Sequence, residues 1–345
     1  MKTLPHYISF LKENRTKEQA LDIFNQRIKD SIEVYNKFSE EFVKRDCPIC
    51  GSVHYTELEK FNEQYGVVEC SKCSSMFVNP SPNLAALEFY YNNCECNKQL
   101  GSLLRERVGK KGVILSERTS IVLSLIDELL KTKPQLKVLE VGSNSGAFLH
   151  ELREGLIAKE CLDSVSFIGI DIDETAVNNP VDNNISLFHS SAEDFVDKSQ
   201  QSFDLILHFE LIEHLHNPFE FCCALYELLN KEGLMYFHTP NALGLDNQAM
   251  NYNDFRPLAH GIFPPMHLNA FTTQNVSHFL IRSGFNVKKI ETPGNFDVDI
   301  VRQFCEEGSE LSVISKIKDE QSLAILQFVL RTLGASSHLA VLAAK

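Results

Sequence analysis

The stretch from Leu136 to Leu149, LKVLEVGSNSGAFL, constrains the fold of this 345-residue chain more than any other. It predicts a buried strand, a turn bounded by Gly142 and Gly146, and the first turns of a helix. Such a turn leaves backbone N–H groups free for a ligand, and glycine lets that ligand approach the backbone closely. An acid, Glu140, stands on the strand just before the turn. Because a carboxylate repels a pyrophosphate and attracts a cation, the order E-x-G-x-N-x-G favours a cationic ligand over a dinucleotide.

Three further apolar segments predict strands downstream of the turn. The second strand, Phe167 to Asp171, ends in an acid that is placed to accept two ribose hydroxyls. A third short strand, 185–188, precedes the polar run SAED at 191–194, and a fourth, 203–208, leads into FELIEH at 209–214. Ligands of open α/β sheets bind outside the carboxyl ends of the strands, so these polar residues predict one binding edge.

In this order, the segments resemble the class I S-adenosylmethionine-dependent methyltransferases, over residues 137–345. The resemblance implies an α/β fold with a doubly wound seven-stranded sheet, strand order 3-2-1-4-5-7-6, in which the seventh strand is antiparallel. Residues 233–238, 285–291 and 338–344 supply the fifth, sixth and seventh strands. Asn144 stands where many members have glycine, but ExGSNxG is similar to the turn of sugar-modifying methyltransferases. The alternative is a doubly wound domain that binds another nucleotide.

The resemblance also implies a cofactor, S-adenosylmethionine, and a set of residues that bind it. The methionine end is assigned to Glu140, Gly142, Ser143, Asn144 and Gly146, and the ribose to Asp171. The adenine is assigned to Ala192 and Glu193, and the methyl group lies beside His208 and Phe209. Two of these positions have a structural alternative, because Asp171 could instead cap a helix and Glu193 could be a first-turn helix charge.

Two C-x2-C pairs upstream of the core form the pattern C-x2-C-x19-C-x2-C, with Cys47, Cys50, Cys70 and Cys73. Each pair can place two thiolates on one face of a turn, and the two pairs complete a tetrahedral zinc site. Four thiolates leave no open position on the metal, so this Zn²⁺ is predicted to be structural. The segments between the pairs predict the strands of a zinc ribbon.

These features divide the chain into four predicted parts. They are an N-terminal helical segment at 1–45, a zinc ribbon at 46–80, a helical linker at 81–135 and the methyltransferase domain at 136–345. Within the last part, the mainly helical stretch at 297–334 is predicted to form a lid. Apolar residues recur at spacings of three and four from Leu21 to Phe42, which predicts a packing helix or a homodimer contact.

The charge of the chain bears on its partners. Lys and Arg number 33 against 46 Asp and Glu, a formal net charge of −13, with no basic cluster. This argues against a phosphate-backbone partner such as RNA. No apolar run reaches the length of a membrane helix and the N-terminus is too polar for a signal peptide, so the sequence predicts a cytoplasmic protein without a membrane partner.

The acceptor is inferred from the order of the parts. A ribbon, a helix with Tyr90 and Tyr91, and then the core is similar to bacterial sugar C-methyltransferases. Their large C-terminal domain and Tyr/His/Glu set are not recognisable here, so the sequence favours O-methylation of a small molecule such as a nucleotide-linked or surface-polysaccharide sugar. The alternatives are a C- or N-methyltransferase of a sugar, a zinc-ribbon RNA methyltransferase and a non-catalytic cofactor-binding subunit.

Methyl transfer requires alignment of the nucleophile and removal of its proton, a task that histidine performs near neutral pH. The preferred base is His267, with His214 as a second catalytic residue, over the other candidates His208, His238 and His260. His267 could equally be a structural histidine. The segment Glu210-x-x-Glu213-His214 resembles the magnesium-binding segment of ubiquinone-pathway O-methyltransferases, although metal-independent relatives share its Glu-His pair, so Mg²⁺ is the less favoured alternative.

Overall fold

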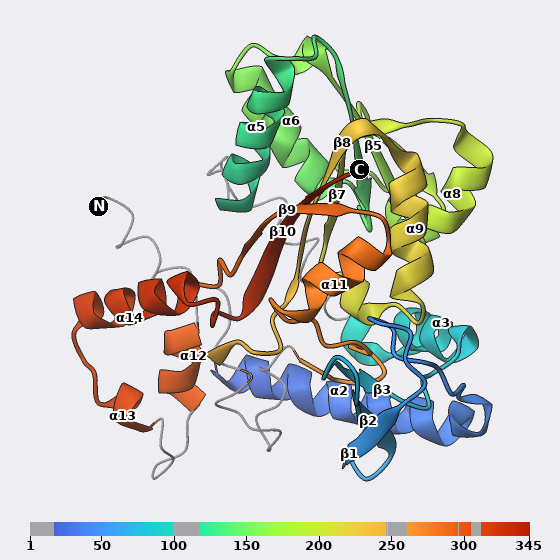
Figure 1. Cartoon of the computed structure of the whole chain (residues 1–345), viewed down its shortest axis with the longest axis vertical. Coiled ribbons are helices and arrows are strands. Elements are labelled where there is room, and N and C mark those ends of the chain that lie inside the picture. The colour runs from blue at the N-terminus through green and yellow to red at the C-terminus, as the bar shows by residue number, and fades with distance from the viewer. Residues whose placement is uncertain (1–16, 99–116, 246, 248–260, 296, 305–311) are drawn as a thin grey trace.

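A seven-stranded sheet runs through the computed structural model, which describes residues 17–98, 117–245, 247, 261–295, 297–304 and 312–345 (Figure 1). The strand order is β6-β5-β4-β7-β8-β10-β9. The strands are β4 (Leu136–Val141), β5 (Val165–Asp171), β6 (Ser186–His189), β7 (Phe203–Phe209), β8 (Leu229–Pro240), β9 (Asn286–Glu291) and β10 (His338–Ala344). The pairs from β6 to β8 are parallel, whereas β10 is antiparallel to both of its neighbours. The predicted order, 3-2-1-4-5-7-6 with an antiparallel seventh strand, is confirmed.

Helices cover both faces of this sheet, which explains why six of the seven residues of the central strand β7 are buried. One face packs against α5 (Glu117–Leu130) and α6 (Ala147–Ala158). The other face packs against α8 (Ala192–Ser199), α9 (Pro218–Leu228) and α11 (Asn275–Arg282). Short helical turns lie in the connections, namely η2 (Leu162–Ser164), α7 (Glu174–Val177) and η3 (Ile212–His214).

A second, three-stranded sheet lies at the bottom of Figure 1 beside two helices. Its antiparallel strands are β1 (Tyr55–Phe61), β2 (Tyr65–Cys70) and β3 (Met76–Val78), and the helices are α2 (Lys17–Phe38), followed by the turn η1 (Ser39–Glu41), and α3 (Leu84–Asn93). The four ribbon cysteines lie at this sheet. Apolar residues of the ribbon, among them Ile49 and Phe77, belong to the same buried cluster as Leu139 and Phe237 of the large sheet. Part of the ribbon and the large sheet therefore share one apolar cluster.

Two arginines tie the ribbon to the large sheet through backbone carbonyls. Arg45 donates to the carbonyl oxygens of Val78, His216 and Leu268, at 3.2, 2.8 and 2.9 Å. Arg282 of α11 donates to the carbonyl oxygens of the first cysteine knuckle, between Cys47 and Cys50, at 3.2 and 3.3 Å. Each guanidinium thus supplies side-chain donors to backbone carbonyl groups at the border of the ribbon.

Three helices, α12 (Asp297–Phe304), α13 (Ser312–Ser315) and α14 (Glu320–Thr332), lie between β9 and β10 in the chain and form a separate buried cluster. They match the predicted helical character of 297–334, and the lid function stays a prediction. His260, one of the candidate bases, lies outside the described residues. Among the helices that the structure describes, none combines the length and apolar character that a bilayer crossing requires.

Candidate active site

The turn after β4 has the backbone geometry of a close-approach loop. Gly142 and Gly146 have φ angles of +75° and +77°, and Asn144 between them has +49°. A Cβ at Gly142 or Gly146 would also press on a leucine side chain at 3.3 Å, that of Leu211 or Leu187. Left-handed backbone and limited space together require glycine at both positions. Asparagine tolerates this conformation better than most residues, which suits Asn144 to its positive φ.

Glu140 is a buried carboxylate without a full set of partners. Its side chain is 4% exposed, and its Oε2 has no hydrogen-bond partner within the described residues. Burial raises the pKa of Glu140 well above its usual range, Arg118 opposes this shift and Asp171 adds to it. An unpaired buried carboxylate is costly, so this position suits a ligand that brings a cation or a hydrogen-bond donor.

Asp171, at the end of β5, is bound to the turn itself. Its Oδ2 accepts from the backbone N–H of Asn144 at 2.7 Å, and its Oδ1 accepts from that of Asp173 at 2.8 Å. Burial raises its pKa, and these N–H groups oppose the shift. The N-cap of α7 is Asp173, whose side chain accepts from Ala176. Asp171 lies beside the turn, as predicted, and its ribose contact stays a prediction.

The two predicted adenine residues begin α8. Ala192 is 2% exposed and Glu193 is exposed, and the N-cap of the helix is Ser191, whose side chain accepts from the N–H of Asp194. Glu193 thus has the position of a first-turn acid, and its cofactor contact stays a prediction.

His208 and Phe209, at the end of β7, point to opposite faces of the sheet because they are neighbours on a strand. Phe209 lies on the face of Glu140, since β4 pairs Glu140 with Leu207, two residues away. His208 lies on the other face, fully buried, with its ring stacked on Phe237 at 4.5 Å and neither ring nitrogen hydrogen-bonded within the described residues. Burial lowers its pKa to about 3. The structure brings Phe209 to the side of Glu140 and places His208 away from it.

Arg118 and His338, which the sequence did not single out, both contact Glu210 next to Phe209. The guanidinium of Arg118 lies 4.4 Å from the centre of the Phe209 ring and 3.8 Å from a carboxylate oxygen of Glu210. The other oxygen of Glu210 lies 3.6 Å from Nε2 of His338, at the start of β10. The spacing of Arg118 on an amphipathic helix gave no signal, because charges there usually face solvent.

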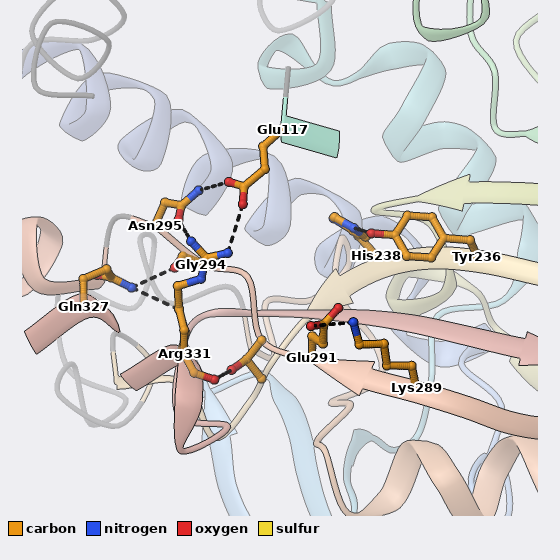
Figure 2. Close-up of polar contacts among 11 residues, drawn as sticks. Glu117, Tyr236, His238, Lys289, Glu291, Gly294, Asn295, Gln327 and Arg331 are labelled. Carbon is orange, nitrogen blue, oxygen red and sulfur yellow. Dashed lines mark hydrogen bonds and ion pairs between the residues drawn. The ribbon is translucent and has the colours of Figure 1, made fainter. Parts of the chain in front are cut away.

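Tyr236 and His238 of β8 lie side by side on the same face (Figure 2). The Tyr236 hydroxyl and His238 Nε2 are 2.8 Å apart. Burial lowers the pKa of His238 to about 2, and the positive charge of Arg118 adds to this shift. His238 is therefore neutral at physiological pH and bonded within its own strand.

A polar network holds the start of α5 against α14 (Figure 2). Glu117 accepts from Nη2 of Arg331 at 2.9 Å and from Nδ2 of Asn295 at 2.8 Å. Arg331 also donates to Oδ1 of Asn295 at 2.8 Å, and Gln327 donates to the Gly294 carbonyl at 2.8 Å. This network fixes the turn that carries Arg118.

The predicted catalytic histidines are neighbours. The ring centres of His214 and His267 lie 4.6 Å apart, and both lie with Glu213 in a cluster whose possible ligand atoms are within 4.8 Å of one another. Nδ1 of His214 lies 2.9 Å from the Met266 carbonyl and 2.9 Å from the Tyr91 hydroxyl. Donation to the carbonyl leaves the lone pair on Nε2, which lies 3.6 Å from Glu213 Oε1. Burial lowers the pKa of His214 to about 4.

Glu210, the first acid of the predicted magnesium segment, is not in this cluster and instead contacts Arg118 and His338. Glu213 is 1% exposed, and its Oε2 accepts from Thr239 at 2.9 Å. Burial and the charge of Glu210 raise the pKa of Glu213 well above its usual range. Glu213 and His214 thus lie together with His267, whereas Glu210 lies apart from them.

The four ribbon cysteines converge on one point. Their sulfur atoms lie within 4.8 Å of one another, with 3.6 Å between Cys47 and Cys73 and 3.5 Å between Cys50 and Cys70. A tetrahedral zinc ion with Zn–S bonds of about 2.3 Å separates its sulfurs by roughly 3.8 Å. The donor set and its spacing therefore fit Zn²⁺.

The chain was compared with known families and structures. A family model described as "Methyltransferase domain" matches residues 114–290. No curated protein matches the chain.

Three solved structures match the chain at low identity. The plantazolicin methyltransferase BamL, solved with SAH and a desmethyl substrate analogue, is 16% identical, with 75% of this chain and 94% of that chain covered and a TM-score of 0.47. A SAM-dependent methyltransferase from Archaeoglobus fulgidus is 19% identical (71% and 99% covered, TM-score 0.42). Coclaurine N-methyltransferase is 14% identical (68% and 75% covered, TM-score 0.41).

Proposed function

Because the chain belongs to the methyltransferase-domain family, we propose that it transfers the methyl group of S-adenosylmethionine to a small-molecule acceptor. The observation that carries this proposal is the buried carboxylate of Glu140, whose Oε2 lacks a partner, in front of a turn that two positive-φ glycines open to a ligand. S-adenosylmethionine would supply an electrophilic methyl group on a sulfonium ion. A cationic cofactor with an ammonium group fits a buried acid, whereas a pyrophosphate would be repelled.

We propose that the cofactor lies along the carboxyl edge of β4, β5 and β7. The turn from Gly142 to Gly146, with Ser143 and Asn144, would hold its methionine end, and Asp171 its ribose. Two observations support this map: Ser143 Oγ is buried without a partner in the described residues, and the Asp171 carboxylate is fixed by backbone N–H groups at 2.7 and 2.8 Å. Phe209 would lie beside the methyl group, on the face of Glu140.

For the acceptor, we propose an oxygen of a nucleotide-linked or surface-polysaccharide sugar. The formal net charge of −13 supports a small-molecule acceptor over a nucleic acid, as does the ribbon at 46–80, which carries five acids against two lysines. The chemistry needs an acceptor hydroxyl held in line with the methyl–sulfur bond and a base for its proton.

We propose His267 as that base, with His214 as its partner. Their rings are 4.6 Å apart, and the lowered pKa of His214 keeps it neutral at pH 7, so the pair would carry no positive charge before proton transfer. Replacement of His267 by Gln should lower kcat by roughly 10²–10⁴-fold with little effect on cofactor affinity, in line with general-base catalysis. An H267Q enzyme with wild-type kcat would remove His267 from this role.

We propose that the four cysteines hold a structural Zn²⁺ that stabilises the ribbon. Their saturated thiolate set leaves the metal no position for substrate.

Two measurements test the proposed function. Calorimetry on the zinc-loaded chain should detect binding of S-adenosylmethionine and of S-adenosylhomocysteine. Mass spectrometry of nucleotide-sugar pools and surface glycans, with and without the gene, should then show a difference of one methylene unit, together with substrate-dependent release of S-adenosylhomocysteine from the purified protein. Absence of cofactor binding would overturn the proposal.

A further inference from the structure

One face of the N-terminal helix α2 is tied to two segments of the candidate active site. Oγ of Ser31 donates to the Pro264 carbonyl at 2.8 Å, in the segment that leads to His267. Oδ2 of Asp30 accepts from the backbone N–H of Cys96 at 2.8 Å, shortly after α3 ends. This face of α2 therefore lies against both the segment that carries His267 and the end of α3.

Arg27 lies on the same face, one turn earlier in α2. It precedes Asp30 by three residues and Ser31 by four, the spacing at which side chains of a helix lie one above the other. Burial lowers the pKa of His214 to about 4, and the positive charge of Arg27 adds to this shift. Burial raises the pKa of Tyr91, and Arg27 opposes that shift. Arg27 therefore lies beside the pair formed by Tyr91 and His214, whose hydroxyl and Nδ1 are 2.9 Å apart.

The guanidinium of Arg27 has no anionic partner in the described part of the chain. Its Nε is shielded from water and makes no hydrogen bond there, and no described carboxylate forms an ion pair with it. Acids outnumber basic residues by 46 to 33, so a shortage of acids does not explain this. Because a buried donor without an acceptor costs free energy, this position suits a ligand that brings an anion.

A second buried donor without an acceptor lies close by. Tyr90 is fully buried, and its hydroxyl makes no hydrogen bond within the described residues. Its ring lies 5.2 Å from that of Tyr91. Burial raises its pKa well above the ordinary value, and the charge of Arg27 opposes this shift, so the phenol keeps its proton at neutral pH. A guanidinium and a phenol that both lack an acceptor suit an oxyanion, because its lone pairs can accept from both.

We propose that Arg27 and the Tyr90 hydroxyl bind an anionic group of the methyl acceptor, a phosphate or a carboxylate, beside the pair of Tyr91 and His214. This inference rests on the proposed function and deepens it, because it requires the acceptor to carry an oxyanion. A neutral sugar would leave both donors unpaired. The inference also gives α2, which the sequence predicted as a packing helix or a dimer contact, a part in recognition of the acceptor.

Three sugars that differ in one group test the inference on the zinc-loaded full chain saturated with S-adenosylhomocysteine. The probes are glucose 1-phosphate, glucuronate and glucose, which carry a phosphate, a carboxylate or neither. Ligand-observed NMR gives their dissociation constants. The variants are Arg27→Gln, Arg27→Lys and Tyr90→Phe. The matched control is Lys29→Gln, which removes an exposed cation of the same helix.

Wild type should bind one or both charged probes at least about tenfold more tightly than glucose, because hydrogen bonds between charged groups are the strong ones. The charged probe that binds more tightly identifies the anion as a phosphate or a carboxylate. Arg27→Gln should abolish the preference over glucose, Arg27→Lys should recover part of it, and Lys29→Gln should leave it unchanged. Tyr90→Phe should weaken the charged probe without lowering the melting temperature of the ligand-free protein, because the hydroxyl that it removes has no partner there.

Equal affinity of wild type for the three probes, or a preference that Arg27→Gln retains, would overturn the assignment of Arg27 and leave the proposed function in place. A Tyr90→Phe variant that melts below wild type would remove Tyr90 from the site, because its hydroxyl would then have a structural role. A wild-type chain that does not bind S-adenosylhomocysteine would overturn the proposed function itself. Thermal melts establish that each variant is folded before binding is measured.

Discussion

In the ligand-free protein, the surroundings of Glu140 do little to stabilise its ionised carboxylate. The carboxyl is 4% exposed, and Oε2 has no hydrogen-bond partner in the described chain. Its folded-state pKa is raised well above the ordinary value of 4.5. Above pH 4.5 the unfolded chain therefore loses this proton first, so the group lowers stability as pH rises toward its folded pKa.

Replacement of Glu140 by Gln should separate stability from binding. Gln cannot ionise, so ligand-free Glu140→Gln should melt at a higher temperature than wild type at pH 8, and the difference should shrink toward pH 5. Affinity for S-adenosylhomocysteine should fall at least about tenfold, because the charged partner of the ammonium group is gone. Melts from pH 5 to pH 8 and calorimetry check both effects. A variant less stable than wild type at pH 8 would contradict this electrostatic account.

His208 predicts a pH dependence with the opposite sign. Burial holds its folded pKa at about 3, below the ordinary value of 6.5. Below pH 6.5 the unfolded chain takes up a proton that the folded chain does not, so stability is lost as pH falls. His208→Phe, which preserves the stack on Phe237, should remove about 2 kcal/mol of the loss between pH 7.5 and pH 5. Urea unfolding at the two pH values measures this difference, and parallel behaviour of variant and wild type would refute the assignment.

At the scale of elements, the joint between the ribbon and the sheet depends on Arg45. Its guanidinium donates to carbonyls of three segments that are far apart in sequence, at Val78, His216 and Leu268. Burial lowers its pKa to about 9, so it remains charged at neutral pH.

Arg45→Ala should destabilise the protein by about 3 kcal/mol, because three carbonyls lose a charged donor. The neighbouring Lys44 is exposed and serves as the matched control, since Lys44→Ala should change stability by less than about 0.5 kcal/mol. Urea unfolding followed by circular dichroism measures both variants. Equal stability of the two would show that the Arg45 contacts contribute nothing.

The ribbon itself is expected to depend on metal. If Zn²⁺ fills the cluster, the purified chain should contain one zinc per molecule, and Cys47→Ser should lose it together with several degrees of melting temperature. Cys161 lies outside the cluster, so Cys161→Ser should keep both. Metal analysis by mass spectrometry and thermal melts decide the matter. Full stability of Cys47→Ser without zinc would contradict a structural role.

At the scale of the whole molecule, the charge balance predicts which partners are absent. With a formal net charge of −13, the chain repels polyanions at a distance. Electrophoretic mobility shift with a mixture of structured RNAs should therefore show no binding at 150 mM salt. Lowering the salt to 50 mM should not produce binding, because an acidic protein neutralises few RNA phosphates and so releases few of their counterions. Salt-sensitive RNA binding would favour the zinc-ribbon RNA methyltransferase.

The sequence predicted the parts whose signal is local. The apolar run 203–208 predicts a buried strand from its composition and length alone. Asp171 is recognisable as a candidate binding residue because it stands at the end of such a strand. The strand order came from the resemblance and is confirmed by the pairing. The start of β8 was placed at Gly233, whereas the strand begins at Leu229, because α9 ends at Leu228 and passes into the strand without a turn signal.

The candidate site was less predictable because tertiary contacts create it. In the sequence, Arg118 cannot be told apart from an ordinary surface charge. Its contact with Phe209 becomes visible only in the folded structure, where α5 places the two side chains together. His208 and Phe209 are adjacent in the sequence, and the choice of face depends on the strand register, which pairs Glu140 with Leu207. Which histidine removes the acceptor proton depends on the acceptor, and the predicted pair His214 and His267 stays a prediction.

Ile49 and Phe77 of the ribbon lie in the same apolar cluster as Leu139 of the central strand. A module buried in this way should not transfer to another enzyme as a separate cassette, because a cut at its border would leave apolar side chains of the shared cluster open to water.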